Sequence, residues 1–226
     1  MLPLIRLLQL ASPALPVGAY TYSQGLEWAV ESGAVRDEAA AARWIGDLLE
    51  RNLARFEAPL LSCLIEAWAA GDDAAVVALN ADFLASRETA ELRAETVQMG
   101  YSLVRLLADL DAFAALPGWH VRLRALDTPS FPAAWAAAAS AWAIPVDMAL
   151  PAYLWAWLEN QVMAAVKAVP LGQSAGQRLL ATLGARIPEL AAQAAQLRAD
   201  QWSNFTPGLA LASSRHETQY TRLFRS

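Results

Sequence analysis

The chain has 226 residues, of which 56% are hydrophobic and 17% charged, and its formal net charge is −5. Such an apolar composition excludes an intrinsically disordered chain, and the acidic balance argues against a protein that binds nucleic acid through a broad basic face. The apolar content exceeds what the core of one small monomer needs. We therefore expect the surplus to be covered at a self-association or partner interface.

The distribution of charge and the number of cysteines indicate what the chain contacts and in which compartment it works. Residues 1–166 carry 10 Lys and Arg against 19 Asp and Glu, a net charge of −9, whereas residues 167–226 carry 7 against 3, a net charge of +4. A basic last quarter on an acidic body predicts an acidic docking partner or contact with the body itself. The single cysteine, Cys63, excludes an internal disulfide and indicates a reducing, cytoplasmic compartment.

Helical periodicity runs along nearly the whole chain. We expect helices over residues 4–11 and 23–33, one beginning at Asp37, one from Pro59 to Gly71, one beginning at Asp72, and others over 86–116, 130–143, 147–169 and 172–200. No run of alternating β-branched residues indicates a sheet. The predicted fold class is all-α: a single-domain helical bundle of about eight to ten helices over residues 1–200, with a polar C-terminal tail.

The most apolar stretch, residues 131–158, is a candidate for a membrane helix. Pro132, Pro145, Asp147 and Pro151 interrupt it, and no window reaches the ~20 unbroken apolar residues that a membrane span requires. Buried helices are therefore the expectation here, and no membrane partner is predicted.

The last segment, residues 201–226, is more polar than the rest and contains Arg215, Arg222 and Arg225 against a single acidic residue, Glu217. Polar terminal segments are usually mobile unless they are docked. This one also carries apolar residues that can serve as anchors, namely Leu209, Leu211, Tyr220, Leu223 and Phe224. We expect a tail that becomes ordered when a partner binds.

The residues that build metal and nucleotide sites are scarce. The chain has two histidines, His120 and His216, and one cysteine, so a zinc-type site cannot be assembled from soft ligands. Carboxylates on one predicted helix face, Glu88, Glu91 and Glu95, have no histidine at the spacing of a carboxylate-bridged metal site, and a solvated acidic face is the better interpretation. No Gly-Lys-Ser/Thr follows Gly172 and Gly176, so no phosphate-binding loop is predicted. No cofactor is expected.

One pattern does suggest catalysis. Residues 172–176 match G-x-S-x-G, which would make Ser174 a nucleophile, with His216 as its base and Asp200 orienting the base. That motif needs a buried strand before it, whereas a helix running into Pro170 precedes it here. A serine hydrolase therefore stays as the alternative function. The competing interpretation is a junction at which two helix backbones approach closely at the glycines.

Four blocks of sequence together resemble the urease accessory protein UreF family. They read LASPALPVGAYTYSQGLE at residues 10–27, RET to QMG over 87–100, KAVPLGQ with GQR over 167–178, and TPGL to RHETQYTRLFRS over 206–226. The blocks occur in the order found in the family and are spread over essentially the whole chain.

This resemblance implies an all-helical, dimeric chaperone for nickel insertion that is not itself an enzyme. It further implies two direct partners, the scaffold protein UreD (UreH in some species) and the GTPase UreG, and a complex that docks on apo-urease. In such a complex the chain would present UreG and modulate its GTPase cycle while the nickel cation is delivered.

Three groups of residues are predicted to contact partners. Tyr20 and Tyr22 stand in a loop over residues 12–23, either as exposed anchors or as plugs of the chain's own core. Around the break at Pro170, the polar residues assigned to a partner such as the GTPase are Lys167, Gln173, Gln177 and Arg178. In the tail, the residues assigned to the scaffold are Arg215, Tyr220, Arg222 and Phe224. Arg178 is also a candidate arginine finger, and a truncation after Leu209 is expected to fold but to lose the complex.

Overall fold

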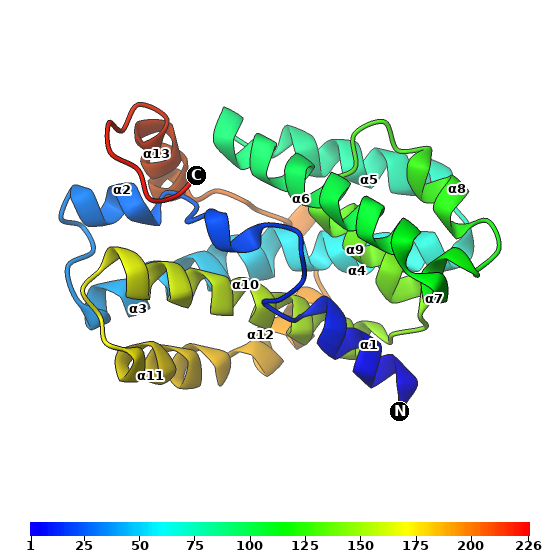
Figure 1. Ribbon diagram of the computed structural model, residues 1–226, viewed down its shortest axis with the longest axis horizontal. Coiled ribbons are helices and arrows are strands. Elements are labelled where there is room, and N and C mark those ends of the chain that lie inside the picture. The colour runs from blue at the N-terminus through cyan, green and yellow to red at the C-terminus, as the bar shows by residue number, and fades with distance from the viewer.

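The computed structural model describes all 226 residues, and it is helical with no strand (Figure 1). In chain order the α-helices are α1 (Leu2–Leu10), α2 (Leu26–Glu31), α3 (Glu38–Leu48), α4 (Ala58–Ala70), α5 (Asp73–Ala85), α6 (Ala90–Asp109), α7 (Asp111–Ala114), α8 (Trp119–Arg124), α9 (Phe131–Ala141), α10 (Val146–Ala168), α11 (Gln173–Gly184), α12 (Ile187–Ala194) and α13 (Pro207–His216). The predicted all-α fold class is confirmed. The number of helices lies a little above the prediction because two predicted helices are divided and because α8 and α13 lie outside the predicted ones, α13 within the predicted polar tail.

Helix starts follow the capping residues of the sequence. The side chain of Asp37 accepts a hydrogen bond from the backbone N–H of Ala40 at 2.8 Å, and that of Asp72 accepts one from Ala75 at 3.0 Å. Each side chain satisfies one of the backbone donors that a helix start leaves unpaired. Thr89 does the same for the N–H of Leu92, which fixes the start of α6 at Ala90 rather than at residue 86.

The predicted break before Pro59 is wrong. A π-helical segment, Leu49–Glu57, joins α3 to α4, so the chain is helical without interruption from Glu38 to Ala70. A proline removes one backbone hydrogen bond and its ring collides with the carbonyl four residues earlier in an α-helix. The wider π-helical turn that precedes Pro59 accommodates both effects.

Two other predicted helices are divided. The predicted helix over residues 86–116 is α6 followed by the single turn α7, because Leu110 adopts an extended conformation. The stretch over residues 172–200 is α11 and α12, and α12 carries Pro188 in its first turn. The outline predicted from periodicity is therefore correct, while the ends of the helices depend on single residues.

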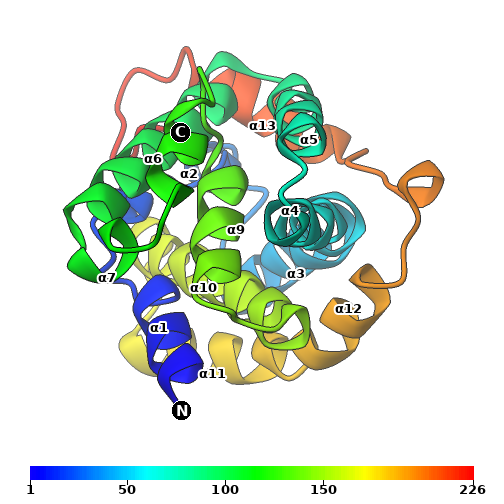
Figure 2. The same cartoon turned by 90° about the vertical axis from the view of Figure 1, so that its right-hand side faces the viewer.

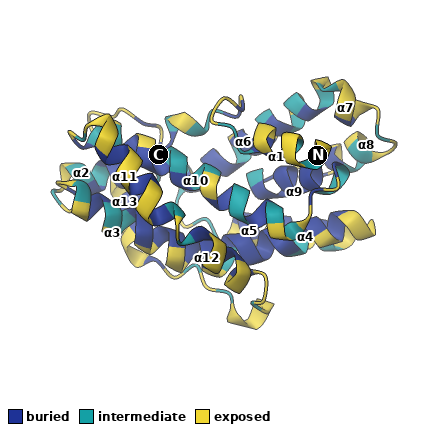
Figure 3. Cartoon of the chain, turned by 90° about the horizontal axis from the view of Figure 1, so that it is seen from below, coloured by how far each residue is buried: buried dark blue, intermediate teal, exposed yellow.

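Helices α4 and α9 form the centre of one continuous hydrophobic core (Figures 2 and 3). Residues 133–139 of α9 are buried, and all but Trp135 are alanines, whose small side chains let neighbouring helices approach closely. Trp68 of α4 donates its indole N–H to the carbonyl of Ala133 at 3.1 Å. The apolar stretch over residues 131–158 thus supplies core helices. None of the helices combines the length and apolarity that crossing a bilayer requires.

The C-terminal residues pack against the loop that precedes α2, far from the N-terminus at the start of α1 (Figure 1). They lie beside α2, between α13 and α6. Helix α6 also approaches the chain that leads into α9 closely. A Cβ on Gly100 would lie 2.0 Å from the carbonyl oxygen of Pro129, so only glycine allows α6 to pack against the chain leading into α9.

Candidate functional site

The C-terminal residues are fixed to the N-terminal loop by backbone hydrogen bonds. The N–H of Ser23 donates to the carbonyl oxygen of Ser226 at 2.7 Å, and the N–H of Arg225 donates to that of Thr21 at 2.8 Å. The charge distribution predicted that the basic last quarter contacts either an acidic partner or the body of the chain. In the structure it contacts the body. Residues 217–226, which make this contact, are called the tail.

Glu27 of α2 is the central acceptor for the tail. Its carboxylate accepts the backbone N–H of Leu223 at 2.6 Å and that of Phe224 at 2.9 Å, and its Oε2 lies 3.3 Å from Nε2 of His216. The Glu27 side chain is 8% exposed, so these donors replace the water that its charge would otherwise need. The predicted site did not include Glu27, because nothing in its local sequence distinguishes it from a surface glutamate.

A second carboxylate, Glu91 of α6, completes the attachment. His216 is fully buried, and its Nδ1 lies 2.7 Å from Oε2 of Glu91, while Arg222 contacts the other oxygen of the same carboxylate. Because its two ring nitrogens face carboxylates on different helices, His216 joins α2 to α6 through α13. Gly25 permits this, since a Cβ there would lie 2.9 Å from the backbone nitrogen of Ser213.

Glu95, one turn after Glu91, is buried and binds the end of the tail. It accepts hydrogen bonds from Nε2 of Gln24 at 2.7 Å and from the hydroxyl of Ser226 at 2.8 Å. Burial raises the pKa of Glu95 to about 7. The prediction of a solvated acidic face is wrong for Glu91 and Glu95, because α13 and the tail cover that side of α6. It holds for Glu88, which is exposed.

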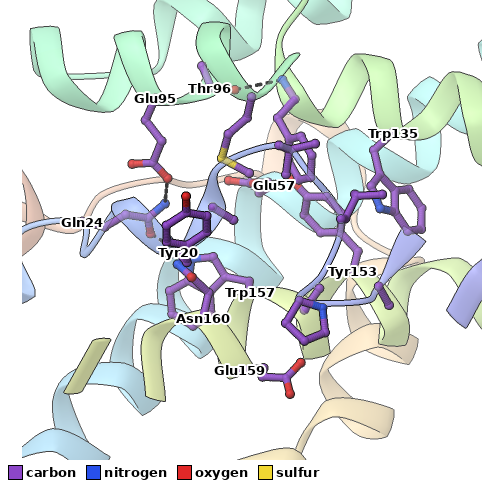
Figure 4. Close-up of a pocket in the computed structure, with 18 of the residues that line it drawn as sticks. Tyr20, Gln24, Glu57, Glu95, Thr96, Trp135, Tyr153, Trp157, Glu159 and Asn160 are labelled. Atoms are coloured by element: carbon purple, nitrogen blue, oxygen red, sulfur yellow. Dashed lines mark hydrogen bonds between the residues drawn. The ribbon is translucent and has the colours of Figure 1, made fainter. Parts of the chain in front are cut away.

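Gln24 connects this polar network to a cavity of about 150 Å³ (Figure 4). Its backbone has φ +53°, a conformation that is uncommon outside glycine, and its Oε1 accepts the indole N–H of Trp157 at 2.8 Å. The cavity lies between the loop over residues 10–20 and helices α6, α9 and α10. In its wall Tyr153 donates to Glu57 at 2.5 Å, and burial together with Glu57 raises the pKa of Tyr153.

The loop residues predicted to contact partners divide into two kinds. Tyr20 is 65% exposed at the edge of the cavity, whereas Tyr22 is 5% exposed and belongs to the core. Exposure of Tyr22 was therefore a wrong expectation, and the alternative that the loop fills its own core describes this residue. Burial raises the pKa of the Tyr22 hydroxyl.

The four residues assigned to the scaffold, Arg215 in α13 and three in the tail, divide in the same way. Arg215 and Tyr220 are exposed, and Tyr220 makes no contact that shields it from solvent. Phe224 is 6% exposed, and Arg222 is held by Glu91. Two of the four residues are thus available to a partner, while the other two attach the tail to the body.

The polar residues around Pro170 are brought together at the junction of α10 and α11. Lys167, Gln173, Gln177 and Arg178 are all exposed, and we call these four residues the junction patch. Arg178 is occupied: its Nε and Nη2 donate to the two oxygens of Glu38 at 2.9 and 2.6 Å. This pairing raises the pKa of Arg178 and lowers that of Glu38.

Comparison with known proteins identifies the family. The UreF family model matches residues 35–184. The chain belongs to the UreF family. It is 80% identical to the urease accessory protein UreF of Azoarcus sp. (strain BH72), over the whole of this chain and 97% of the relative. It is 61% identical to UreF of Dechloromonas aromatica (strain RCB), over the whole chain and 98% of the relative.

A further relative is a fusion. The bifunctional urease accessory protein UreEF of Bordetella bronchiseptica is 50% identical over 99% of this chain, which covers 52% of that relative. UreF proteins are urease accessory proteins, and membership of the family agrees with a role in urease maturation.

The hydrolase arrangement does not exist in this UreF-family chain. Ser174 lies in the first turn of α11 with no strand before it, and His216 is buried between Glu27 and Glu91. Asp200 pairs with Arg198 at 3.0 Å rather than with a histidine. The competing interpretation of the glycines is correct for Gly176, where a Cβ would lie 2.9 Å from the side chain of Val166 in α10. No group of three or more His, Cys, Asp and Glu side chains is arranged to hold a metal ion.

Proposed function

We propose that this chain is an assembly chaperone for urease. It binds the UreD/UreH scaffold, recruits the GTPase UreG to apo-urease, and modulates the GTPase cycle while nickel is delivered in the cytoplasm. It performs no catalysis itself. The observation that carries the proposal is the tail, which is anchored to the body by buried carboxylates yet presents large apolar side chains to solvent.

The scaffold is proposed to bind at the tail and the neighbouring loop. Tyr220, Leu223 and Tyr20 have relative exposures of 102%, 70% and 65%. Exposed aromatic and aliphatic side chains on a rigid support are typical of residues that dominate binding energy, because little entropy is lost when they are covered. The hydrogen bonds to Glu27 provide that rigid support.

The GTPase is proposed to bind at the junction patch. Lys167, Gln173 and Gln177 are accessible there, whereas Arg178 must leave Glu38 before it can reach a phosphate. The Nζ atom of Lys167 also lies 5.9 Å from the centroid of the Phe224 ring, so the junction patch is next to the tail. The two proposed partner sites are therefore neighbours, as a protein that joins two partners requires.

Self-association is proposed to use α1. Leu2, Leu4, Ile5 and Leu8 are each at least 41% exposed on this helix, and a homodimer would cover such an apolar face. The fused Bordetella relative suggests UreE as a further partner.

The test for the scaffold site is a binding assay with the UreD/UreH protein. A double variant, Tyr220→Ala with Leu223→Ser, is expected to weaken binding at least about tenfold, as hot-spot truncation does, without changing the melting temperature. Val77→Ala, on α5, is the control, because Val77 is 53% exposed and lies outside the tail. Unchanged scaffold binding by the double variant would contradict the assignment.

The test for the GTPase site uses the two partners of one ion pair. In the assembled complex, Arg178→Ala is expected to slow GTP hydrolysis by UreG, and Glu38→Gln, which releases Arg178, is expected to leave it unchanged or to speed it up. Equal rates for Arg178→Ala and the wild type would end the arginine-finger hypothesis.

A further inference from the structure

The mouth of the cavity is formed by side chains that are more exposed than its floor. Tyr20 and Met163 are 65% and 39% exposed, while Trp157, Glu159 and Asn160 are half-buried. Figure 4 shows Tyr20 above Trp157 and Glu159 at the opposite edge. Most of the lining residues are hydrophobic. A side chain that enters from solvent therefore meets an aromatic ring, a thioether and the Glu159 carboxylate at the edge of the cavity.

Glu159 is the one cavity carboxylate with no partner in the chain. No hydrogen bond or ion pair joins it to another side chain, and burial alone raises its pKa. The other charges are matched: Glu57 is held by Tyr153 and lies 3.5 Å from Arg87. Glu95 accepts from Gln24 and Ser226. The Glu159 carboxylate at the mouth of the cavity therefore has no cationic partner. The cavity also has no unpaired cation of its own, so nothing in its lining attracts an anion.

Apolar walls and one unpaired carboxylate define the occupant. A lysine or arginine side chain has an apolar stem and a cationic end, and such side chains bury the stem while the charge is paired or hydrated. The rings of Tyr20 and Trp157 add favourable positions for a cation near an aromatic face. A purely apolar side chain would leave Glu159 half-buried and unpaired, at a cost in free energy.

We propose that this cavity receives a basic side chain from a protein partner, with Glu159 pairing the cation and Tyr20, Trp157 and Met163 covering the stem. The inference deepens the proposed function, on which it rests, by assigning the chemistry of a contact beside the tail. Because Trp157 donates to Gln24, and Gln24 to Glu95, occupation of the cavity is connected to the residues that hold Ser226.

The first experiment tests the chemistry of the cavity in the isolated protein. Three probes of equal chain length, n-butylammonium, n-butanol and butanoate, are titrated while the indole N–H signal of Trp157 is followed by NMR, with Trp157→Phe assigning that signal. We expect n-butylammonium to bind about tenfold more tightly than n-butanol, as a charge-assisted contact predicts, and butanoate not to bind. Equal binding of the first two probes, tighter binding of butanoate, or no shift with any probe would overturn the proposal.

Matched variants show whether Glu159 is responsible. Glu159→Gln keeps the size of the side chain and is expected to remove the preference for n-butylammonium. Glu66→Gln removes an exposed carboxylate that does not line the cavity and is expected to retain the preference. A preference that survives in Glu159→Gln would overturn the assignment of the cation to this residue.

The second experiment uses the full chain and its partners. Glu159→Lys is expected to weaken assembly with the scaffold and the GTPase by at least about tenfold, since it opposes two cations, while Glu66→Lys is not. Normal assembly by Glu159→Lys would overturn the proposal. If the wild type binds neither partner although its cavity selects n-butylammonium, the proposed function fails and the cavity stands as a cation site.

Discussion

The tail and the junction patch are both basic, and both are predicted to contact partners, but the body of the protein treats them differently. In the tail, Arg222 is bound by Glu91 and Phe224 is buried, so half of the predicted contacts hold the segment in place. In the junction patch every predicted residue is exposed, and only Arg178 has a carboxylate partner.

Residue type alone therefore does not decide whether a basic segment binds a partner or the body of its own chain. Carboxylates on α2 and α6 decide it here, because without the C-terminal residues Glu27 and Glu91 would be unpaired and Glu95 would keep only Gln24. The junction patch faces only one carboxylate, Glu38, which is exposed enough to be solvated by water.

A truncation after Leu209 should have the largest effect on stability, because it removes the tail and leaves the junction patch in place. It removes most of α13 and the whole tail, which leaves Glu27 and Glu91 without their donors, leaves Glu95 with Gln24 alone, and exposes the surface under Ala212. We expect the free energy of unfolding to fall by at least about 3 kcal/mol in urea titrations, so the expectation from the sequence that this truncation folds normally is revised. Unfolding at the wild-type urea concentration would show that the tail is not anchored as described.

Single substitutions should separate the buried contact from the exposed one. His216→Ala leaves Glu27 and Glu91 facing each other in a buried site, and we expect a loss of about 3 kcal/mol. Arg222→Ala removes a side chain that is 37% exposed, and its loss should stay below about 1 kcal/mol. Urea unfolding of both variants gives the comparison, and equal losses would contradict it.

The pH dependence of stability should identify Glu95. Its pKa is raised from 4.5 to about 7 in the folded chain, so the folded state favours the protonated carboxyl. Stability from this group is therefore fully present below pH ~4.5 and is lost as pH rises through about 7. Relative to Glu95→Gln, which cannot ionise, the wild type should lose roughly 3 kcal/mol between pH 4.5 and pH 8. A constant difference over this range would contradict the assignment, and Glu66→Gln is the control.

The smallest effect on stability is expected in the junction patch. Arg178→Ala breaks an ion pair between two exposed side chains, where water and salt replace the partner. The melting temperature should match that of the wild type, even though hydrolysis by the bound GTPase is expected to change. A clear fall in the melting temperature would mean that the junction patch is held as firmly as the tail.

Much of the fold could be predicted because its causes are local. Asp37 and Asp72 cap helices as expected, and periodicity separated the helices from the loops. The π-helical segment before Pro59 was missed because a proline usually begins a helix, whereas here the wider turns that precede it let the helix continue through Pro59.

The site was less predictable for a related reason. The burial of Glu91 and Glu95 depends on a segment that is more than 100 residues away in the chain. The unequal distribution of charge was the one signal that pointed to this contact. The unpaired Glu159 is detected only when every neighbour of the cavity is known.

Light scattering coupled to size-exclusion chromatography shows whether this chain holds partner proteins together. The protein is run alone, then with the UreD/UreH scaffold and UreG from the same source. We expect a dimer that shifts into a stoichiometric complex containing both partners. A protein whose mass is unchanged by either partner would contradict the proposed function.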